Sequence, residues 1–342
     1  TGQLGAVVSS RLTDDPILIT AGYVGAGGFA AVTGQLVVLG GLQLIDELLR
    51  PGTAAATVLA IGAAGALTAA LMREMLFEDD APLIMLATAA VLWVFAHLLG
   101  RLDPVIVVTA VVVTVILGWV SYVLGTASVA GMIAGVLLGY LVIVLGGFSW
   151  FVILMGFFGV GALSTKYRYR QKQLRGVAEA NAGARGTGNV LGNAAVAMAA
   201  VAVAAASTTD SVVFLWSQLA FAGAIATALA DTLSSEIGGL YDTPRLITTL
   251  QPVPPGTDGA VTTQGELAGL AGAVTIAGVA AVGFGLSVTA FVLITTGAVV
   301  GMHIDSLLGA TVEDLYIDNE MVNLLATLVG ALVTVGVAAV VL

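Results

Sequence analysis

The sequence contains no cysteine, which excludes disulfides, thiolate metal sites and thiol nucleophiles. Histidine is nearly absent as well, with only His97 and His303, so there is no histidine cluster for a zinc site. Charged residues make up only 9% of the chain, against roughly 25% in soluble proteins. Hydrophobic residues make up 58% of the chain, and its mean hydropathy is +1.06. This composition excludes an ordinary soluble domain.

Lysine is also scarce. The chain has 11 basic and 21 acidic residues, and only two of the basic ones, Lys166 and Lys172, are lysines. Acidic, lysine-poor loops are what a salt-adapted organism uses to keep exposed segments hydrated, so we expect a halophilic archaeal source. The acidic balance argues against nucleic acid as a partner. The chain begins at Thr1 without methionine and shows no signal peptide, so we expect a trimmed terminus.

Apolar runs of about 20 residues, the length of a helix that crosses a bilayer, recur along the chain. A backbone in lipid must satisfy its own hydrogen bonds, so we predict an all-α, polytopic transmembrane helical bundle. We predict about eleven spans, at residues 17–45, 53–72, 82–99, 104–124, 128–145, 148–163, 189–206, 211–230, 267–284, 287–304 and 322–342. The sixth is short and follows Gly146-Gly147, which leaves a tilted, broken or re-entrant segment open.

The basic residues predict the orientation. Alternating the spans places only Arg50 and Arg101 on one side. The other side receives Arg11, Arg73, Lys166, Arg168, Arg170, Lys172, Arg175, Arg185 and Arg245. The positive-inside rule makes this second side, with the N-terminus, cytoplasmic. The long polar stretches 164–188, 231–266 and 305–321 fall there too, so we expect a multi-pass cell-membrane protein whose active face is cytoplasmic.

The two halves of the chain differ in kind. Between residues 17 and 163 every charged residue lies between spans. We therefore predict a helical membrane scaffold over 1–163 and a membrane domain with the functional loops over 164–342.

The first polar stretch is rich in cations, including Lys166, Lys172 and Arg185. One interpretation is an ordinary positive-inside loop, and the other is a phosphate clamp, since guanidinium and ammonium groups neutralise phosphate. Asn189 and Asn193 are four residues apart and share one face of the next helix. Amides there are costly in lipid, so we expect them to line a wet cavity.

Carboxylates follow two of the later spans. Asp231 is on the same helical face as Thr227, whereas Glu236 lies further round, so both acids reach one ligand only if the helix ends or bends there. A solvated acid at a helix end is the alternative to a magnesium site. Asp305 resembles Asp231 as a single acid beside a serine at the end of a span, and we infer that the two hold one cation between them.

The stretch 248–265 carries three prolines and several glycines, which impose a fixed non-helical path. A loop rich in glycine and threonine before a helix can present backbone N–H groups to phosphate, although connecting loops look similar. Thr263 to Glu266 has the pattern of a capping box that opens the ninth span.

Three of these segments together resemble one membrane family. Residues 231–238, 254–262 and 305–311, followed by Asn319 and Asn323, look like the prenyl-phosphate (phytyl-phosphate) kinase family of archaea, cyanobacteria, plants and animals. The resemblance covers roughly 164–330. It implies transfer of a phosphate from a nucleoside triphosphate to an isoprenoid monophosphate, such as geranylgeranyl or phytyl phosphate, to give the diphosphate.

That chemistry depends on metal, cations and positioning rather than on a histidine base, because a phosphate monoester is already a nucleophile. The catalytic candidates are Asp231, Asp305 and Lys166. The candidate ligands for Mg²⁺ are Asp231, Glu236, Asp258 and Asp305. The candidates for binding nucleotide or substrate phosphate are Lys172, Arg185, Asn189, Asn193, Arg245, Gly256, Thr257, Gly259, Asn319 and Asn323.

Other functions remain open at this point. There is no P-loop, so nucleotide binding is implied by the resemblance alone. A secondary transporter or channel for a small ion or phosphorylated solute is the main alternative, since glycine-rich spans with polar ends are common in transporters. A lipid-synthesis transferase would show several aspartates at helical spacing on one segment, and this sequence has no such segment. A purely structural protein would have no need for three elaborate polar loops on one side.

Overall fold

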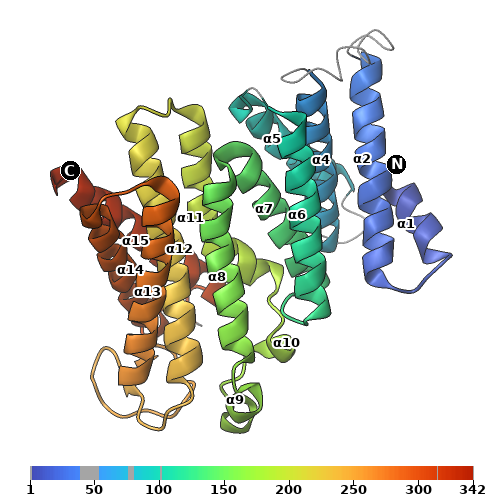
Figure 1. Cartoon of the computed structure of the whole chain (residues 1–342). Helices are drawn as coiled ribbons and strands as arrows, with labels where there is room; N and C mark the ends of the chain where they lie inside the picture. Colours follow the sequence, from blue (N-terminus) through green and yellow to red (C-terminus); the bar gives the residue numbers. More distant parts are fainter. Residues whose placement is uncertain (1, 39–53, 76–80, 101, 314, 342) are drawn as a thin grey trace. The chain divides into compact units, whose positions relative to one another are not determined.

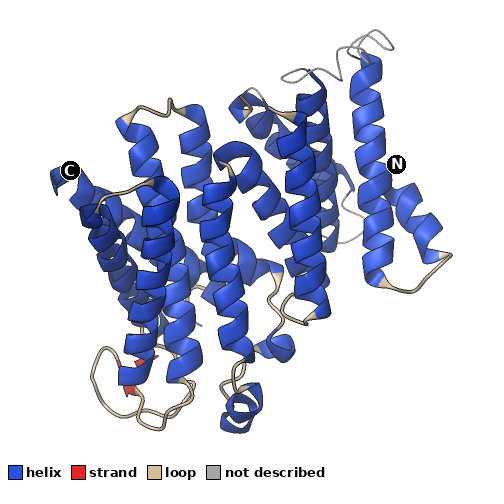
Figure 2. Cartoon of the chain, in the orientation of Figure 1, coloured by secondary structure: helices blue, strands red, loops and turns tan. Residues whose placement is uncertain are grey.

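The computed structural model describes residues 2–38, 54–75, 81–100, 102–313 and 315–341. Within these ranges the chain is almost entirely helical, and ten helices are long and apolar enough to cross a membrane. Several shorter helices and one pair of two-residue strands complete the described structure (Figure 2). The predicted all-α, polytopic membrane architecture is confirmed.

The chain forms two compact units, Thr1–Leu145 and Gly146–Leu342. The helices of the first unit are α1 (Gly2–Ser10), α2 (Pro16–Val38), α4 (Ala54–Met75), α5 (Ala81–Leu98), α6 (Pro104–Val123) and α7 (Val129–Gly146). In it, α1 packs on α2, α2 on α4, and α4 on α5 and α6. The short helix α1 is not among the predicted spans. It lies very close to α2, since a Cβ on Gly5 would come within 2.1 Å of the Gly22 carbonyl oxygen.

The second unit is built around one long helix, α12 (Figure 1). Its helices are α8 (Phe148–Lys166), α9 (Tyr169–Arg175), α10 (Ala180–Gly183), α11 (Thr187–Ala206), α12 (Val212–Gly238), α13 (Thr263–Phe284), α14 (Val288–Gly309) and α15 (Asn319–Val341). Helix α12 packs against α8, α11, α13, α14 and α15. Every residue from 221 to 230 of α12 is buried, because most are alanine or glycine and let neighbouring helices approach closely.

Three helices meet at Thr227 of α12. A Cβ on Gly301 of α14 would come within 2.5 Å of the Thr227 side chain, and one on Gly330 of α15 within 2.0 Å. The hydroxyl of Thr227 donates a hydrogen bond to the Gly223 carbonyl at 2.8 Å, so no polar atom is left unpaired there. Glycine thus fixes the positions of α14 and α15 on α12, one helical turn before Asp231.

Each of the eleven predicted ranges overlaps one helix of the structure. The sixth is the continuous helix α8 of 19 residues, which excludes the broken segment left open above. The number of helices that cross the membrane and their orientation stay predictions. Arg50, Arg101, residues 39–45 of the first predicted span and the last residue of the eleventh lie outside the described residues.

The predicted domain boundary at 163/164 differs from the division between the compact units at 145/146. Helix α8 belongs to the second unit because it packs on α12 and α13, so the division comes before α8 and not after it.

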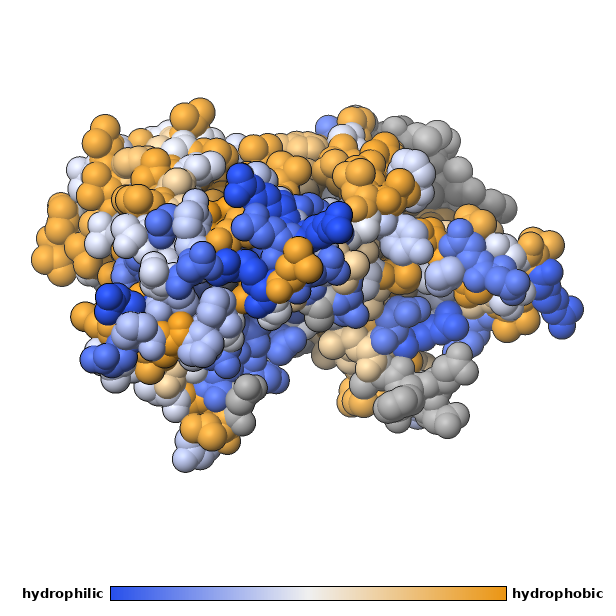
Figure 3. All heavy atoms as spheres, turned by 90° about the horizontal axis from the view of Figure 1, so that it is seen from below, coloured by the Kyte–Doolittle hydropathy of each residue, from blue (hydrophilic) through white to orange (hydrophobic). Residues whose placement is uncertain are grey.

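The polar stretches of the second unit gather at one end of its helices, the lower end in Figure 1. This end carries the last residues of α8, α12 and α14 and the first residues of α11, α13 and α15. Hydrophilic residues gather over it in the view from below (Figure 3). The strands β1 (Arg245–Leu246) and β2 (Ala260–Val261) pair antiparallel in the loop between α12 and α13, with Arg245 opposite Val261.

Candidate functional site

A polar pocket of about 430 Å³ opens at this end of the second unit. It is formed by the loop before α10, the start of α11, the end of α12, the loop before α13, the end of α14 and the start of α15. Most of the predicted site residues line it, namely Arg185, Asn189, Asn193, Asp231, Glu236, Gly256, Thr257, Asp258, Gly259, Asp305, Asn319 and Asn323. The fold therefore brings together residues that are more than 130 positions apart in the sequence.

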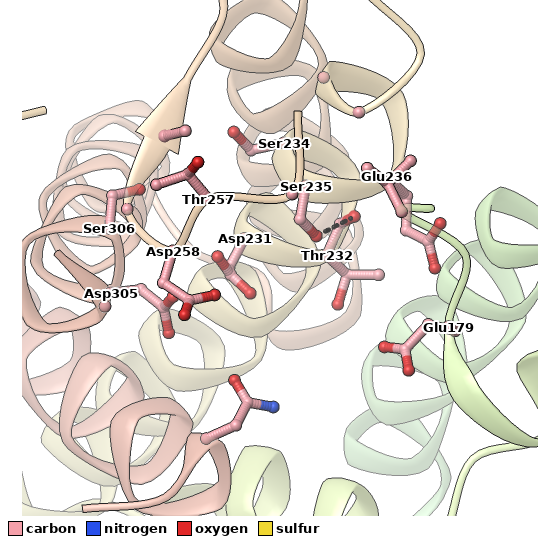
Figure 4. A pocket seen from close by; sticks show the side chains of 18 of the residues that line it. Glu179, Asp231, Thr232, Ser234, Ser235, Glu236, Thr257, Asp258, Asp305 and Ser306 are labelled. Atoms are coloured by element: carbon pink, nitrogen blue, oxygen red, sulfur yellow. Dashed lines mark hydrogen bonds between the residues drawn. The ribbon is translucent and has the colours of Figure 1, made fainter. Parts of the chain in front are cut away.

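Asp231 and Asp305 face each other in this pocket. Asp231 follows Thr227 by one turn of α12, and Asp305 follows Gly301 by one turn of α14. Because Thr227 and Gly301 are in contact and the two helices end on the same side, the next turn brings the two carboxyl groups within hydrogen-bonding range. Figure 4 shows Asp258 pointing into the same part of the pocket.

These carboxyl groups need a positive partner. Both lie near the C-terminal ends of long helices, and their like charges repel each other. The Oδ2 atom of Asp305 is buried and has no hydrogen-bond partner among the described residues. Two half-buried carboxyl groups this close repel each other when both are charged, and sharing a proton or binding a cation relieves the repulsion.

The residues present fit Mg²⁺ bound together with phosphate. Within the described ranges, no three His, Asp or Glu side chains lie close enough to hold a metal ion alone. Mg²⁺ does not require such a cage, because it usually takes one or two carboxylates and completes its shell with waters and substrate phosphates. Asp231 and Asp305 supply that pair, and the unpartnered Oδ2 of Asp305 provides a free ligand atom.

Arg185 also lines the pocket, from the loop between α10 and α11. Its guanidinium carbon is 4.9 Å from the centre of the Phe157 ring, and its Nη1 atom is buried without a hydrogen-bond partner in the described structure. Gly161 of α8 makes the space for it, since a Cβ there would be 2.6 Å from Nη2. Burial lowers the pKa of the Arg185 guanidinium, while the charges of Glu179, Glu236 and Asp231 raise it. Arginine stays protonated under such conditions, so the described lining of the pocket contains a half-buried cation with an unpaired Nη1.

The predicted asparagines form two equivalent pairs. Asn193 donates from Nδ2 to the Asn189 carbonyl at 2.9 Å, and Asn323 donates to the Asn319 carbonyl at 3.0 Å. The Oδ1 atom of Asn189 is buried and unpartnered within the described chain. The shared face predicted for Asn189 and Asn193 is present, and both asparagine pairs line the polar pocket.

The loop before α13 covers the pocket. Gly256 and Gly259 have φ angles of +83° and +69°, which other residues adopt only with strain. Gly259 lies so close to α14 that a Cβ would be 2.3 Å from the Ser306 carbonyl oxygen, and Gly256 lies against Val177. The loop therefore spans the pocket on the fixed, non-helical path that its glycines predict.

The capping box predicted at Thr263 to Glu266 is wrong by one residue. Thr262 is the N-cap of α13, and its hydroxyl accepts a hydrogen bond from the Gly265 N–H at 3.0 Å. Glu266 pairs instead with His303 of α14, at 3.1 Å between Oε2 and Nε2.

Three predicted cations do not line the pocket. The ammonium of Lys172 is buried and bonded to Glu236 and to the carbonyls of Ser164 and Thr165. Lys166 donates to the Ala182 carbonyl at 2.8 Å, and Arg245 donates to the Leu250 carbonyl at 2.7 Å. In this structure all three hold loops together, and none points at the site where phosphate is expected.

Glu236 lines the edge of the pocket but is turned away from Asp231. Helix α12 runs unbroken to Gly238, so the condition under which both acids meet one ligand is not fulfilled. Its carboxylate is bonded to Lys172, and we therefore leave Glu236 out of the metal site.

Two acidic residues that the sequence reasoning did not select also line the pocket, Glu179 and Glu313. Each lies in a polar stretch singled out above, but in a loop without helical periodicity. Only the positions of the neighbouring helix ends reveal that these side chains reach the pocket.

Comparison with known proteins agrees with this architecture. The model of the family described as integral membrane protein DUF92 matches residues 112–331, more than half of the chain. This chain belongs to the DUF92 integral membrane family. The matched region contains the whole pocket and starts well before the stretch 164–330 that carries the sequence resemblance.

Several curated relatives also match this chain. An uncharacterized membrane protein of Synechocystis is 34% identical over 199 residues, covering 56% of this chain and 75% of the relative. One of Methanocaldococcus jannaschii is 35% identical over 207 residues, covering 60% and 83%. Protein VTE6, chloroplastic, of Arabidopsis thaliana is 30% identical over 214 residues, covering 61% and 64%. No solved structure matches the chain.

Proposed function

We propose that this protein is an integral membrane kinase that transfers the terminal phosphate of a nucleoside triphosphate to an isoprenoid monophosphate, giving the diphosphate. One observation supports the proposal above all others. Two half-buried carboxyl groups, Asp231 and Asp305, and a half-buried guanidinium, Arg185, line one polar pocket at the end of a membrane bundle, and Asp305 and Arg185 each have a buried polar atom without a partner in the described structure. The resemblance to prenyl-phosphate kinases and the relationship to VTE6 support the substrate class.

The reaction needs little from the protein beyond positioning. An oxygen of the acceptor phosphate attacks the γ-phosphorus, a new P–O–P bond forms, and the bond to the β,γ-bridging oxygen breaks to release the nucleoside diphosphate. The acceptor is already an anion at neutral pH, so no side chain has to remove a proton. A bound Mg²⁺ would neutralise the β- and γ-phosphate oxygens, and Asp231 and Asp305 are the residues that would hold it.

The charge of the pocket indicates that the nucleotide enters as a metal complex. The described lining carries one guanidinium, Arg185, and six carboxyl side chains, at Glu179, Asp231, Glu236, Asp258, Asp305 and Glu313. Even with Glu236 paired to Lys172, this pocket repels a free triphosphate. We therefore propose Mg²⁺ as an obligatory cofactor and the metal–nucleotide complex as the co-substrate.

The transporter alternative receives less support from the same geometry. Transporter sites usually lie near the middle of the membrane, at broken helices. Here α12 and α14 are continuous, and the acids Asp231 and Asp305 lie within their last two turns. A loop with a fixed backbone path closes over them.

The test is transfer of labelled phosphate from ATP, CTP, GTP or UTP to geranylgeranyl phosphate by the purified full-length chain with Mg²⁺. Asp305→Asn is the test variant. Asp210→Asn is the matched control, because Asp210 is exposed in the short loop at the other end of the second unit. We expect diphosphate product from the wild type and the control, and a near-complete loss in Asp305→Asn. Folded wild-type protein that forms no product with any nucleotide would refute the kinase proposal and favour transport.

A further inference from the structure

The pocket has two sides of opposite character. Figure 4 shows Asp231, Asp258 and Asp305 together on one side and Glu179 on the other. Arg185 lines the same pocket, and the charge that acts on it most strongly is that of Glu179. Three buried polar atoms that line this pocket lack a hydrogen-bond partner in the described structure. They are Oδ2 of Asp305 on the acidic side, and Nη1 of Arg185 and Oδ1 of Asn189 on the other. Both sides are therefore incomplete without a ligand, and they require ligands of different charge.

Resting on the kinase function proposed above, we propose a division of the pocket into two subsites. Arg185 and Asn189, at the start of α11, bind the phosphate of the isoprenoid acceptor. Asp231, Asp305 and the loop over them hold the metal and the triphosphate donor.

The start of α11 is suited to an anion. Helix α11 has 20 residues, and its N-cap, Gly186, offers no side-chain hydrogen bond to the first turn. Unpaired N–H groups and the positive end of the helix dipole attract a phosphate at such a position. The unpartnered guanidinium Nη1 is the independent sign of a ligand, since a buried arginine N–H without an acceptor is costly.

Asn189 completes the subsite. It lies in the first turn of α11, and its carbonyl already accepts the hydrogen bond from Asn193. A side-chain amide can turn by 180°, so Asn189 can offer Nδ2 as a donor to phosphate in place of the unpartnered Oδ1.

Charge favours the monophosphate on this side. One guanidinium and a helix N-terminus match a monoester of charge about −2, whereas a triphosphate needs divalent cations, which the acidic side attracts.

The apolar surroundings of Arg185 also favour the acceptor. The guanidinium lies over the Phe157 ring of α8, an apolar helix of 19 residues that is long enough to span the membrane. An isoprenoid whose phosphate is bound to Arg185 thus begins its hydrocarbon chain beside an apolar helix.

Gly161 provides a second way to disturb this subsite. The Cβ of Gly161→Ala would overlap the Arg185 guanidinium, which lies at the flexible end of its side chain and can shift. This variant keeps Arg185 and its charge but displaces the group from its position. Arg170→Gln is the matched control, because it removes an equal charge from an exposed side chain of α9 that does not line the pocket.

The experiment measures binding of two probes to the full-length chain in detergent with Mg²⁺, without transfer. The probes are geranylgeranyl phosphate and inorganic tripolyphosphate. Arg185→Gln is expected to weaken geranylgeranyl phosphate binding at least about tenfold, because a charge-assisted contact is lost. It should change tripolyphosphate binding less than about threefold. Asp305→Asn should weaken tripolyphosphate binding and leave geranylgeranyl phosphate binding nearly unchanged. Gly161→Ala should weaken geranylgeranyl phosphate binding, as Arg185→Gln does. Arg170→Gln should bind both probes like the wild type.

Two outcomes would overturn the division. In the first, Arg185→Gln or Gly161→Ala weakens the binding of tripolyphosphate more than the binding of geranylgeranyl phosphate. The other is folded wild-type protein that does not bind geranylgeranyl phosphate. If Arg185→Gln does not fold, Gly161→Ala decides. A protein that binds both probes in separate subsites but transfers no phosphate would refute the kinase function and leave the subsites standing.

Discussion

Each unit of the chain contains a cavity of several hundred cubic ångströms, and the two cavities differ in their linings. In the first unit a cavity of about 330 Å³ lies between α2, α4 and α6, and every residue that lines it is valine, leucine, alanine, glycine or threonine. The pocket of the second unit, at about 430 Å³, is lined by acids, amides and Arg185. The first cavity has an apolar lining, whereas the second contains buried polar atoms that have no partner in the described structure.

The difference arises at the helix ends. In the second unit, α12 and α14 carry acids near their C-terminal ends, and α11 and α15 begin with pairs of asparagines. Glycines also let α12, α14 and α15 pack in close contact. Helices of the same apolar character thus form a scaffold or a site according to a few residues at one end. Variants in the two units should therefore affect different properties.

The largest effect is expected from the acidic pair. Asp231→Asn and Asp305→Asn should each reduce phosphate transfer about 100- to 1,000-fold, since each removes charge stabilisation from the transferring phosphate. Thermal stability should not fall, because a neutral amide relieves the repulsion between two half-buried carboxyl groups. Melting temperature and transfer rate of the same preparations check this. A variant that keeps more than a tenth of the wild-type rate would exclude that acid from the active site.

The next effect is on the stability of the second unit. Lys172→Met leaves the buried carboxylate of Glu236 without its partner, and this should cost about 3 kcal/mol. The double variant Lys172→Met, Glu236→Leu removes both charges and should recover most of that loss. Thermal unfolding in detergent measures both variants. Equal destabilisation of the single and double variants would mean that the ion pair is not the origin of the effect.

The smallest effect compares one glycine from each unit. Gly330→Ala places a Cβ against Thr227 and should destabilise the chain by about 1–3 kcal/mol. Gly25→Ala in α2 of the first unit meets nothing within 4 Å, so it should leave stability unchanged or raise it by up to about 1 kcal/mol. If both variants unfold at the same temperature, the close contact at Thr227 does not organise the pocket.

Much of this structure could be predicted from the sequence. The apolar runs gave the helices because a membrane leaves few alternatives to a helix of about 20 residues. The similar settings of Asp231 and Asp305 predicted that they lie together, and both line one pocket. Helix periodicity placed Glu236 further round the helix than Asp231, but Glu236 was still among the predicted metal ligands, and the unbroken α12 does not bring it to Asp231.

Other features depend on contacts that no local pattern shows. Lys166, Lys172 and Arg245 have the residue type expected for phosphate binding, but their hydrogen bonds go to carbonyls and to Glu236. All four residues are basic, and the sequence does not show that three of them bind loop carbonyls or Glu236 while Arg185 lines the pocket. The short helix α1 was missed because nine residues are too few to register as a span.

The most direct test of the central claim is the binding of Mn²⁺, used in place of Mg²⁺ and followed by electron paramagnetic resonance, in the full-length chain with tripolyphosphate. We predict that the wild type and Asp210→Asn bind the ion equally, and that Asp231→Asn and Asp305→Asn each bind it at least about tenfold more weakly. Wild-type affinity in both of these variants would show that the acidic pair does not hold the metal, and would contradict the proposed active site.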